Sequence, residues 1–433
     1  MIYNLIIYLY LLGVAVYSRF NEKVRKMWRG ERDAFRVLKE KVDPNAKYVW
    51  FHAASLGEFE QGRPLMEQLR KKHPEYKILL TFFSPSGYEV RKNYEGADII
   101  TYLPLDTITN ARRFLRAIHP VMAFFIKYEF WYNYLHILKH RNVPVYSVSS
   151  IFRPDQVFFK WYGRQYGRVL NCFTHFFVQN EISKELLGKI GIHNVSIVGD
   201  TRFDRVLQIK EAAKQLPIVE EFLEVRGEKL EVRDYQKPHV FVAGSSWPPD
   251  EEIFIKYFNE HRDWKLIIAP HVIGEDHLKQ IEKLLEGRKV VRYTVAEKSA
   301  ENSAAENSLT SHLLPLTSYD VLIIDCFGLL SSIYHYGDVA YVGGGFCVGI
   351  HNLLEAAVWD VPVFFGPNNQ RFQEAQGLKK SGGFEIANYE DFEKQMNRFV
   401  ADEAYLKEQG QMAGQYVKGK AGATQEVLKK VSL

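Results

Sequence analysis

Apolar and polar positions alternate between two kinds of segment along most of the chain. Short runs rich in valine, isoleucine and aromatic residues are separated by longer segments in which apolar residues recur every three or four positions. Strands are expected in the first half at 48–52, 77–81, 98–102, 121–125, 143–148, 175–178 and 195–198. Helices are expected between them at 58–72, 107–118, 131–141, 158–170 and 183–190. Strands that alternate with helices predict βαβ units and a mainly parallel sheet.

The same alternation restarts after residues 210–237, a charged stretch with a helical pattern. Strands are expected in the second half at 239–243, 265–269, 289–292, 321–324, 339–342 and 361–364. Two doubly wound α/β domains that face each other across a cleft are the simplest architecture. We therefore expect an N-terminal domain over 21–209, a linker over 210–237 and a C-terminal domain over 238–433. Within the last, residues 294–318 are rich in Ser, Asn, Glu and Ala and are expected to form a mobile surface insertion.

The N-terminus breaks this pattern. Residues 2–17 contain no charged side chain, and their run is slightly shorter than the about 20 apolar residues of a full membrane span. Basic residues follow the run, whereas a signal peptide carries its positive charge ahead of it. These residues are Arg19, Lys23, Arg25, Lys26, Arg29 and Arg32. The order predicts that residues 1–20 form an uncleaved membrane anchor, spanning or interfacial, with the protein body on the cytoplasmic side. A buried N-terminal helix is the alternative.

Composition changes this picture little. The chain has 433 residues, of which 46% are hydrophobic and 25% charged, as in an ordinary globular protein with a large core. The net charge of +4 is too small to indicate nucleic acid as a partner. Cys172, Cys326 and Cys347 are far apart, which indicates neither a disulfide framework nor a metal site. No Asp-x-Asp or His-Glu-x-x-His motif is present, so we expect chemistry without a metal or other cofactor.

Residues 50–61 (WFHAASLGEFEQ) combine the end of a strand, a tight turn and the start of a helix. In an open parallel sheet, such turns line the crevice at the carboxyl ends of the strands, where ligands bind. We therefore expect Glu58 to point into a cleft, with Ser55 and Gly57 of the same turn beside it. In the alternative reading, Glu58 only complements the dipole of the helix that it begins.

Three further polar turns are expected on the same rim. Ser84 and Ser86 follow the second strand, and Glu129 follows the fourth, close to Trp131. Glu129 is expected either to contact a sugar or to anchor the edge of its domain. Arg202 belongs to the segment that closes this half of the chain, and it is expected either to reach into the cleft or to form a surface salt bridge.

A glycine-rich turn follows the fifth strand expected in the second half. Such a turn brings backbone N–H groups close to a phosphate, and the helix that follows adds partial positive charge. We expect Gly344, Gly345, His351 and Asn352 to hold a phosphate and Glu355 to bind a ribose. The alternative for Asn352 and Glu355 is a capping box at the start of the helix.

The first two strands of the second half also end in candidate donor-binding positions. Gly244, Ser245 and Ser246 follow the first strand and are expected to bind a phosphate or a base edge, although small hydroxylated turn residues are common without ligands. His271 follows the second strand and would face the same crevice. A lone histidine is more often structural or solvated than a ligand-binding group.

Together, these segments resemble the 3-deoxy-D-manno-octulosonic acid (Kdo) transferases. The resemblance covers essentially the whole chain and is carried by HAASLGE (52–58), TFFSPSG (81–87), YEFW (128–131), GDTRFD (199–204), AGSSWPPDEE (243–252) and GGGFCVGIHNLLEA (343–356). It implies the GT-B glycosyltransferase architecture of two Rossmann-like domains. It also implies transfer of Kdo from CMP-Kdo to the lipid A precursor, lipid IVA, at the cytoplasmic face of the inner membrane. Glu58 would be the general base of an inverting reaction, and the second domain would hold CMP.

The chain departs from the family pattern at a few positions. His271 stands where a basic residue is usual, while Tyr132 and Ala356 replace prolines. Two alternatives to Kdo transfer remain at this stage. One is another GT-B nucleotide-sugar enzyme with a different acceptor, or an epimerase of the same architecture. The other is a non-catalytic, membrane-tethered module that binds a nucleotide sugar.

Overall fold

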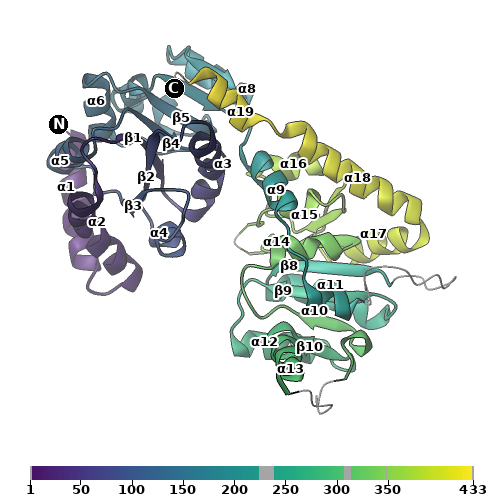
Figure 1. The fold of residues 1–433 in the computed structure, drawn as a ribbon. Helices are drawn as coiled ribbons and strands as arrows, with labels where there is room; N and C mark the ends of the chain where they lie inside the picture. The colour runs from purple at the N-terminus through teal and green to yellow at the C-terminus, as the bar shows by residue number, and fades with distance from the viewer. Residues whose placement is uncertain (1, 224–237, 307–313, 348, 432–433) are drawn as a thin grey trace. The chain divides into compact units, whose positions relative to one another are not determined.

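The structure is a computed structural model that describes residues 2–223, 238–306, 314–347 and 349–431 (Figure 1). The chain forms two compact units. Unit 1 comprises Met1–Arg205 together with Lys420–Leu433, and unit 2 comprises Val206–Gly419. Each unit is built around one seven-stranded sheet in which every strand pair is parallel. The prediction of two parallel α/β sheets is therefore confirmed.

The sheet of unit 1 has the order β3-β2-β1-β4-β5-β6-β7. Its strands are β1 Lys47–Ala53, β2 Tyr76–Phe82, β3 Ile99–Tyr102, β4 Met122–Ile126, β5 Val145–Ser150, β6 His175–Val178 and β7 Val195–Ile197. Its longer helices are α1 Ile2–Tyr17, α2 Glu22–Lys41, α3 Leu56–Lys72, α4 Pro85–Arg91, α5 Ile108–Ile118, α6 Tyr132–His140, α8 Glu181–Lys189 and α19 Ala423–Lys430. Helix α9 Arg202–Glu211 begins in unit 1 and continues into unit 2. Short turns of helix lie between β5 and β6, at η1 Val157–Phe159, η2 Trp161–Gly163, α7 Arg164–Gly167 and η3 Arg168–Cys172.

The central strand β1 explains why this sequence forms a sheet that is covered on both faces. Every residue of β1 after Lys47 is buried, which is typical of a parallel strand with helices on both sides. Successive side chains point to opposite faces, so Trp50 packs with Phe114 and Phe125 on one face. Phe51 packs with the residues of the other face, and its ring stacks on that of Phe124 with centroids 4.7 Å apart.

The sheet of unit 2 has the order β10-β11-β9-β8-β12-β13-β14. Its strands are β8 Val240–Ser246, β9 Lys265–Pro270, β10 Val290–Arg292, β11 Val321–Ile323, β12 Val339–Val342, β13 Val363–Phe365 and β14 Gly383–Glu385. Its helices are α10 Pro217–Phe222, α11 Pro248–Glu260, α12 Glu275–Leu284, α13 Tyr293–Glu306, α14 Leu330–Ile333, α15 Leu354–Ala357, α16 Gln373–Leu378, α17 Tyr389–Ala401 and α18 Glu403–Lys420, with η4 Leu316–Ser318 and η5 Tyr334–Tyr336. The segment expected as an insertion thus contributes α13, while residues 307–313 lie outside the described part.

Both sheets reverse their strand order once. In unit 1 the chain leaves the β1-β2-β3 side and returns to place β4 against β1, and in unit 2 it returns to place β12 against β8. At such a topological switch point, the loops that follow the two central strands diverge and leave room for a ligand. The fold therefore directs attention to the turns that follow β1 and β4 in unit 1 and β8 and β12 in unit 2.

The N-terminal helix α1 lies along unit 1. Its Tyr3 hydroxyl donates a 2.7 Å hydrogen bond to Asp106 Oδ2, and the Tyr3 ring lies 5.0 Å from that of Tyr132. Leu5, Leu9 and Leu12 share one face and are 63%, 61% and 63% exposed. No helix in the described ranges is long and apolar enough to cross a membrane, so a spanning anchor over residues 1–20 is not supported. Helix α1 is instead partly packed and partly exposed.

The C-terminal helix α19 belongs to unit 1, although we expected the second domain to continue to residue 433. Val427 and Leu428 enter the hydrophobic core on the Phe51 side of the first sheet. The Asp204 carboxylate holds the start of α19, since it accepts hydrogen bonds from Gly422 N at 2.5 Å, Thr424 N at 2.7 Å and Thr424 Oγ1 at 2.6 Å. The chain therefore crosses from unit 2 back to unit 1 before it ends.

Replacing Asp204 by alanine is expected to loosen α19. The substitution removes three hydrogen bonds to a carboxylate, so the free energy of local unfolding should fall by at least about 2 kcal/mol. Amide hydrogen exchange across Ala423–Lys430 should then accelerate by roughly 30-fold. Asp402→Ala is the control, because Asp402 accepts only from Tyr405 N at the start of α18. Equal exchange in both variants would show that Asp204 does not hold α19.

Candidate functional site

The turn after β1 places Glu58 in the first turn of α3. Ser55 N donates to Glu58 Oε2 at 3.1 Å, so the carboxylate caps its helix, whereas the alternative reading expected only that it complements the helix dipole. Burial raises the pKa of Glu58 to about 7, and the charge of Glu129 adds to the rise. Lys127 and the backbone N–H groups of Ala54 and Ser55 oppose the shift. The capping hydrogen bond favours the ionised form of Glu58, so the net rise in its pKa comes from burial and from the charge of Glu129.

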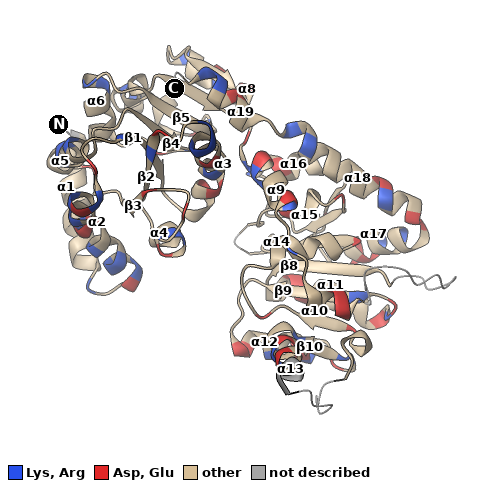
Figure 2. Cartoon of the chain, viewed as in Figure 1, with Lys and Arg blue, Asp and Glu red and all other residues tan. Residues whose placement is uncertain are grey.

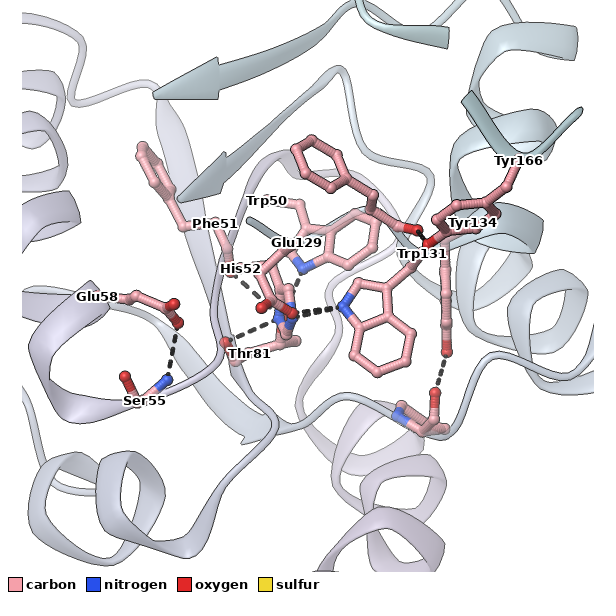
Figure 3. A network of polar contacts seen from close by, with 12 residues as sticks. Trp50, Phe51, His52, Ser55, Glu58, Thr81, Glu129, Trp131, Tyr134 and Tyr166 are labelled. Carbon is pink, nitrogen blue, oxygen red and sulfur yellow. Dashed lines mark hydrogen bonds and ion pairs between the residues drawn. The ribbon is translucent and has the colours of Figure 1, made fainter. Parts of the chain in front are cut away.

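Glu129 is held beside Glu58 by a buried imidazole and an indole. His52 Nε2 lies 3.1 Å from Glu129 Oε2, and Trp131 Nε1 donates to the same oxygen at 2.7 Å. The His52 side chain is fully buried and that of Glu129 is 13% exposed. The Glu58 side chain extends toward this pair (Figure 3). Two carboxylates from the turns after β1 and β4 thus share the switch point of unit 1.

The other end of the His52 ring is fixed by β2. His52 and Thr81 are paired in the β1·β2 register, and His52 Nδ1 lies 2.9 Å from Thr81 Oγ1 (Figure 3). Trp50 Nε1 donates to the same hydroxyl at 2.8 Å. His52 and Thr81 were not among the site residues predicted from the sequence. The available signal was a polar residue inside each of two neighbouring apolar strands, which needs a buried partner.

The serine turn after β2 lies against the Glu58 turn, as predicted. Ser84 N donates to Ala54 O at 2.8 Å, and the Ser84 and Ser86 hydroxyls are 2.7 Å apart at the start of α4. Ser84 is half-buried, whereas Ser86 and Gly57 of the neighbouring turn are exposed. These hydroxyls therefore lie on the same rim as Glu58.

Arg202 lies in an ion pair. Its Nη2 is 2.8 Å and its Nε 2.9 Å from Oδ2 of Asp200, which is 5% exposed. Burial by itself raises the pKa of Asp200, but the charge and hydrogen bonds of Arg202, with a further bond from Gln61, hold it below its usual range. Arg202 therefore forms a salt bridge, but with a buried carboxylate and not with a surface group as the alternative reading expected.

In unit 2, the turns after β8 and β12 are joined by the buried carboxylate of Asp250. Its Oδ2 accepts from Trp247 N and from Gly344 N, both at 2.9 Å, and its Oδ1 accepts from the Tyr341 hydroxyl at 2.8 Å. Burial raises the pKa of Asp250 despite these bonds. The Gly344 N–H, which we expected to face a phosphate, is therefore used inside the protein.

Close packing against the turns after β8 and β13 explains two glycines of the turn after β12. A Cβ on Gly343 would overlap the Ser245 carbonyl oxygen, and one on Gly345 would lie 2.5 Å from Gly366 Cα. Gly244, at the end of β8, is buried, and Ser245 has a positive φ of 52°. Ser246 is buried and donates to Glu251 Oε1 at 2.8 Å. Of the serine pair, Ser245 is the half-buried residue at the strand end.

Three aromatic rings stack beside the glycine turn. The Trp247 and His271 ring centroids are 4.9 Å apart, and those of His271 and His351 are 4.4 Å apart. Trp247 Nε1 donates to His351 Nε2 at 3.3 Å. Burial, together with the neighbouring His271, lowers the pKa of His351 to about 4. His351 is therefore a neutral acceptor at physiological pH, and the exposed His271 is the outer imidazole of the stack.

Asn352 and Glu355 contact one another through their side chains. Asn352 Nδ2 donates to Glu355 Oε1 at 2.9 Å, and Asn352 Oδ1 accepts weakly from Leu354 N at 3.3 Å. The short helix α15 begins at Leu354 with Leu353 at its N-cap, so the expected capping box is not formed by this pair. No group of three or more His, Cys, Asp or Glu side chains able to hold a metal ion occurs within the described ranges.

The shape of both units matches solved structures along most of the chain. The UDP-GlcNAc 2-epimerase of Neisseria meningitidis bound to UDP-GlcNAc matches with a TM-score of 0.60 at 13% identity, covering 88% of this chain and 98% of that one. A glycosyltransferase of Rickettsia africae matches with a TM-score of 0.54 at 10% identity, covering 89% and 97%. These likenesses show the fold alone. They define the class as α/β proteins of two Rossmann-like units, as in GT-B enzymes.

Sequence comparison finds similarity to one family. Residues 26–205 match the family described as 3-deoxy-D-manno-octulosonic-acid transferase (kdotransferase). The chain is 27% identical over 349 residues to 3-deoxy-D-manno-octulosonic acid transferase of Aquifex aeolicus, which covers 78% of this chain and 82% of that protein. It is 25% identical over 352 residues to the protein of the same name from Rickettsia felis, covering 79% and 69%. Residues 26–205 therefore carry the domain of the Kdo transferase family, and the similarity to Kdo transferases extends along most of the chain.

Replacing His271 by phenylalanine is expected to raise the pKa of His351. The substitution keeps a ring between Trp247 and His351 but removes the positive charge that His271 carries when protonated. The pKa should stay below the ordinary value of about 6.5, because His351 remains buried. NMR titration of ¹³C-labelled histidine side chains measures this shift. An unchanged His351 titration would show that burial alone sets its pKa.

Proposed function

We propose that this protein is an inverting glycosyltransferase that moves Kdo from CMP-Kdo to the lipid A precursor, lipid IVA, at the cytoplasmic face of the inner membrane. The match of residues 26–205 to the Kdo transferase family and the similarity to curated Kdo transferases support the class of reaction. The observation that carries the catalytic assignment is Glu58, a carboxylate at the switch point of unit 1 whose pKa is raised to about 7. We assign the acceptor to unit 1 and the donor to unit 2.

Glu58 would take the proton of the acceptor hydroxyl as the new glycosidic bond forms. A sugar hydroxyl is a poor nucleophile until a base accepts its proton, and a base is most effective when its pKa lies near the working pH. Burial and the charge of Glu129 bring Glu58 into that range. His52 and Trp131 keep Glu129 in place, so we assign Glu129 a positioning and electrostatic role. One carboxylate is sufficient for inversion at the sugar carbon.

When Kdo is transferred, CMP would leave the donor as a nucleoside monophosphate anion. Such a leaving group needs hydrogen-bond donors and positive charge where its own charge develops. Ser245 at the end of β8 and His271 at the end of β9 are the polar side chains that we assign to it, because His271 is exposed and Ser245 half-buried. Asn352 and Glu355, which lie 2.9 Å apart, are assigned to the ribose. His351 is neutral and would act as a hydrogen-bonding group rather than as a charge.

We further propose that α1 lies in the membrane interface. The exposed side chains at positions 5, 9, 12 and 16 fall on one helix face. The next helix, α2, carries many Lys and Arg residues along its length (Figure 2). An apolar face combined with basic residues favours binding to the surface of an anionic bilayer. The lipid acceptor is confined to that surface, so a tethered enzyme would meet it there.

Glu58→Gln is expected to abolish transfer while leaving the fold intact. Glutamine can still accept from Ser55 N and cap α3, but it cannot take a proton from the acceptor. We expect kcat to fall by about 10²–10⁴-fold. The measurement is a mass-resolved assay with detergent-solubilised protein, a CMP-Kdo supply and lipid IVA, in which each transfer adds one Kdo mass.

The matched control is Glu67→Gln, the same substitution on the same helix. Glu67 pairs with Arg63 at 2.7 Å, four residues away along α3. Its activity should equal that of the wild type. Full activity of Glu58→Gln would reduce Glu58 to a helix cap. Binding of CMP without product from the wild-type protein would contradict Kdo transfer and favour a binding module or a different acceptor.

The pH dependence of transfer should report the Glu58 pKa. A general base works only when deprotonated, so kcat/KM should rise as the pH increases through about 7. Glu129→Gln removes a neighbouring negative charge and should therefore shift the rise in kcat/KM to lower pH. Lys127→Met removes a positive charge and should shift it to higher pH. Shifts in the same direction, or none, would show that another group controls the profile.

A further inference from the structure

A second candidate binding site lies in unit 1, outside the switch point. The segment between β5 and β6 folds into the short turns η1, η2, α7 and η3, and together with α8 it encloses a pocket of about 690 Å³. The pocket is lined on its apolar side by Phe158 and Leu186. Within this segment, the Phe158 and Tyr166 rings stack with centroids 5.4 Å apart, which connects η1 to α7. The proposed transfer reaction uses none of these residues.

The polar side of the pocket is cationic. Four basic residues line it, and no acidic residue does: Lys160, Arg164, Arg168 and Lys189. Three of these, Arg164, Arg168 and Lys189, are exposed. Within the described part of the chain, none of the four forms a salt bridge. A concave site of this kind, with convergent positive charge and no internal counter-ion, suits a phosphate group.

Trp161 lines this pocket, and Tyr162 follows it in the chain. Trp161 is 83% exposed and Tyr162 is 64% exposed, and their rings lie edge to face with centroids 5.6 Å apart. Exposed Trp and Tyr beside basic residues are typical of the boundary between a membrane and water, where the ring sits among headgroups. In a site for a soluble anion, these rings would remain in water without a partner. The aromatic rim therefore favours a lipid over free phosphate.

The pocket segment is also connected to α1. Tyr166 stacks on Tyr3 with ring centroids 5.9 Å apart, so this segment touches the N-terminal end of the helix whose apolar face is exposed. The pocket segment and α1 thus meet through the contact between Tyr3 and Tyr166, although Leu5 and Trp161 are 156 positions apart in the sequence. We propose that the pocket binds the phosphate of an anionic membrane lipid, with Trp161 and Tyr162 among the headgroups.

This site is independent of the transfer chemistry. It would give the protein a second contact with the membrane, in addition to α1. This contact would fix the orientation of unit 1 on the membrane surface and strengthen its binding there. Helix α1 can bind through apolar area alone, whereas the pocket requires an anionic headgroup. Vesicle binding therefore tests the site without CMP-Kdo, lipid IVA or catalytic turnover, and failure of the proposed reaction would leave the result unchanged.

The test compares the full-length protein with the double variant Arg164→Gln/Arg168→Gln. Co-sedimentation is measured with vesicles of phosphatidylcholine alone and of phosphatidylcholine mixed with phosphatidylglycerol, at low and high salt. The control is Lys71→Gln/Lys72→Gln, which removes two exposed positive charges at the end of α3. Helix α3 packs on the opposite face of the sheet, with the Phe51 side, and α1 is intact in every variant.

On the proposal, the pocket variant should partition onto anionic vesicles roughly tenfold less than the control, and the difference should shrink at high salt. Binding to phosphatidylcholine alone should be equal in both. Trp161→Ser, a change at an exposed position, should also weaken anionic vesicle binding. Equal partitioning of the two double variants overturns the proposal. Loss of inorganic phosphate binding in calorimetry, with unchanged vesicle binding, overturns the lipid assignment and leaves a site for a soluble anion.

Discussion

The first unit depends on the position of β1 in the middle of a parallel sheet. The strand is hydrogen-bonded to β2 on one side and to β4 on the other, and all its residues after Lys47 are buried. Because parallel strands end at the same edge, the turns that follow these three strands must meet there. His52 uses this geometry directly, since its two ring nitrogens lie within hydrogen-bond distance of Thr81 from β2 and of Glu129 beyond β4.

The meeting of these turns brings two carboxylates into a partly buried site. Burial disfavours the charge on Glu58, and the neighbouring charge of Glu129 disfavours it further. The bond from Ser55 N acts in the opposite direction but does not cancel the shift. A single residue therefore caps a helix and also holds a pKa suited to proton transfer. The two readings of Glu58 that the sequence left open are compatible in the structure.

Unit 2 has the same kind of sheet as unit 1, but different residues occupy its switch point. Its switch point is filled largely by internal contacts, because Asp250 accepts hydrogen bonds from the turns after β8 and β12. The glycines of the second turn allow this close approach, as the position of Gly343 against Ser245 shows. The groups that remain for a ligand are side chains on the rim, above all the outer imidazole of the Trp247–His271–His351 stack.

The sequence alone determined the two parallel sheets and the turns that carry Glu58 and Ser245, but not the order of the strands. These features follow from local apolar periodicity and from glycine and serine at strand ends, which are visible in one dimension. Only the tertiary structure decided that α19 packs on unit 1 through Asp204, and that Gly344 N–H is occupied. The same holds for the His52–Glu129 pair, which joins positions 77 residues apart. Hydrogen bonds and burial between distant segments leave no periodic trace, so the partners of a buried polar group appear only when the chain is folded.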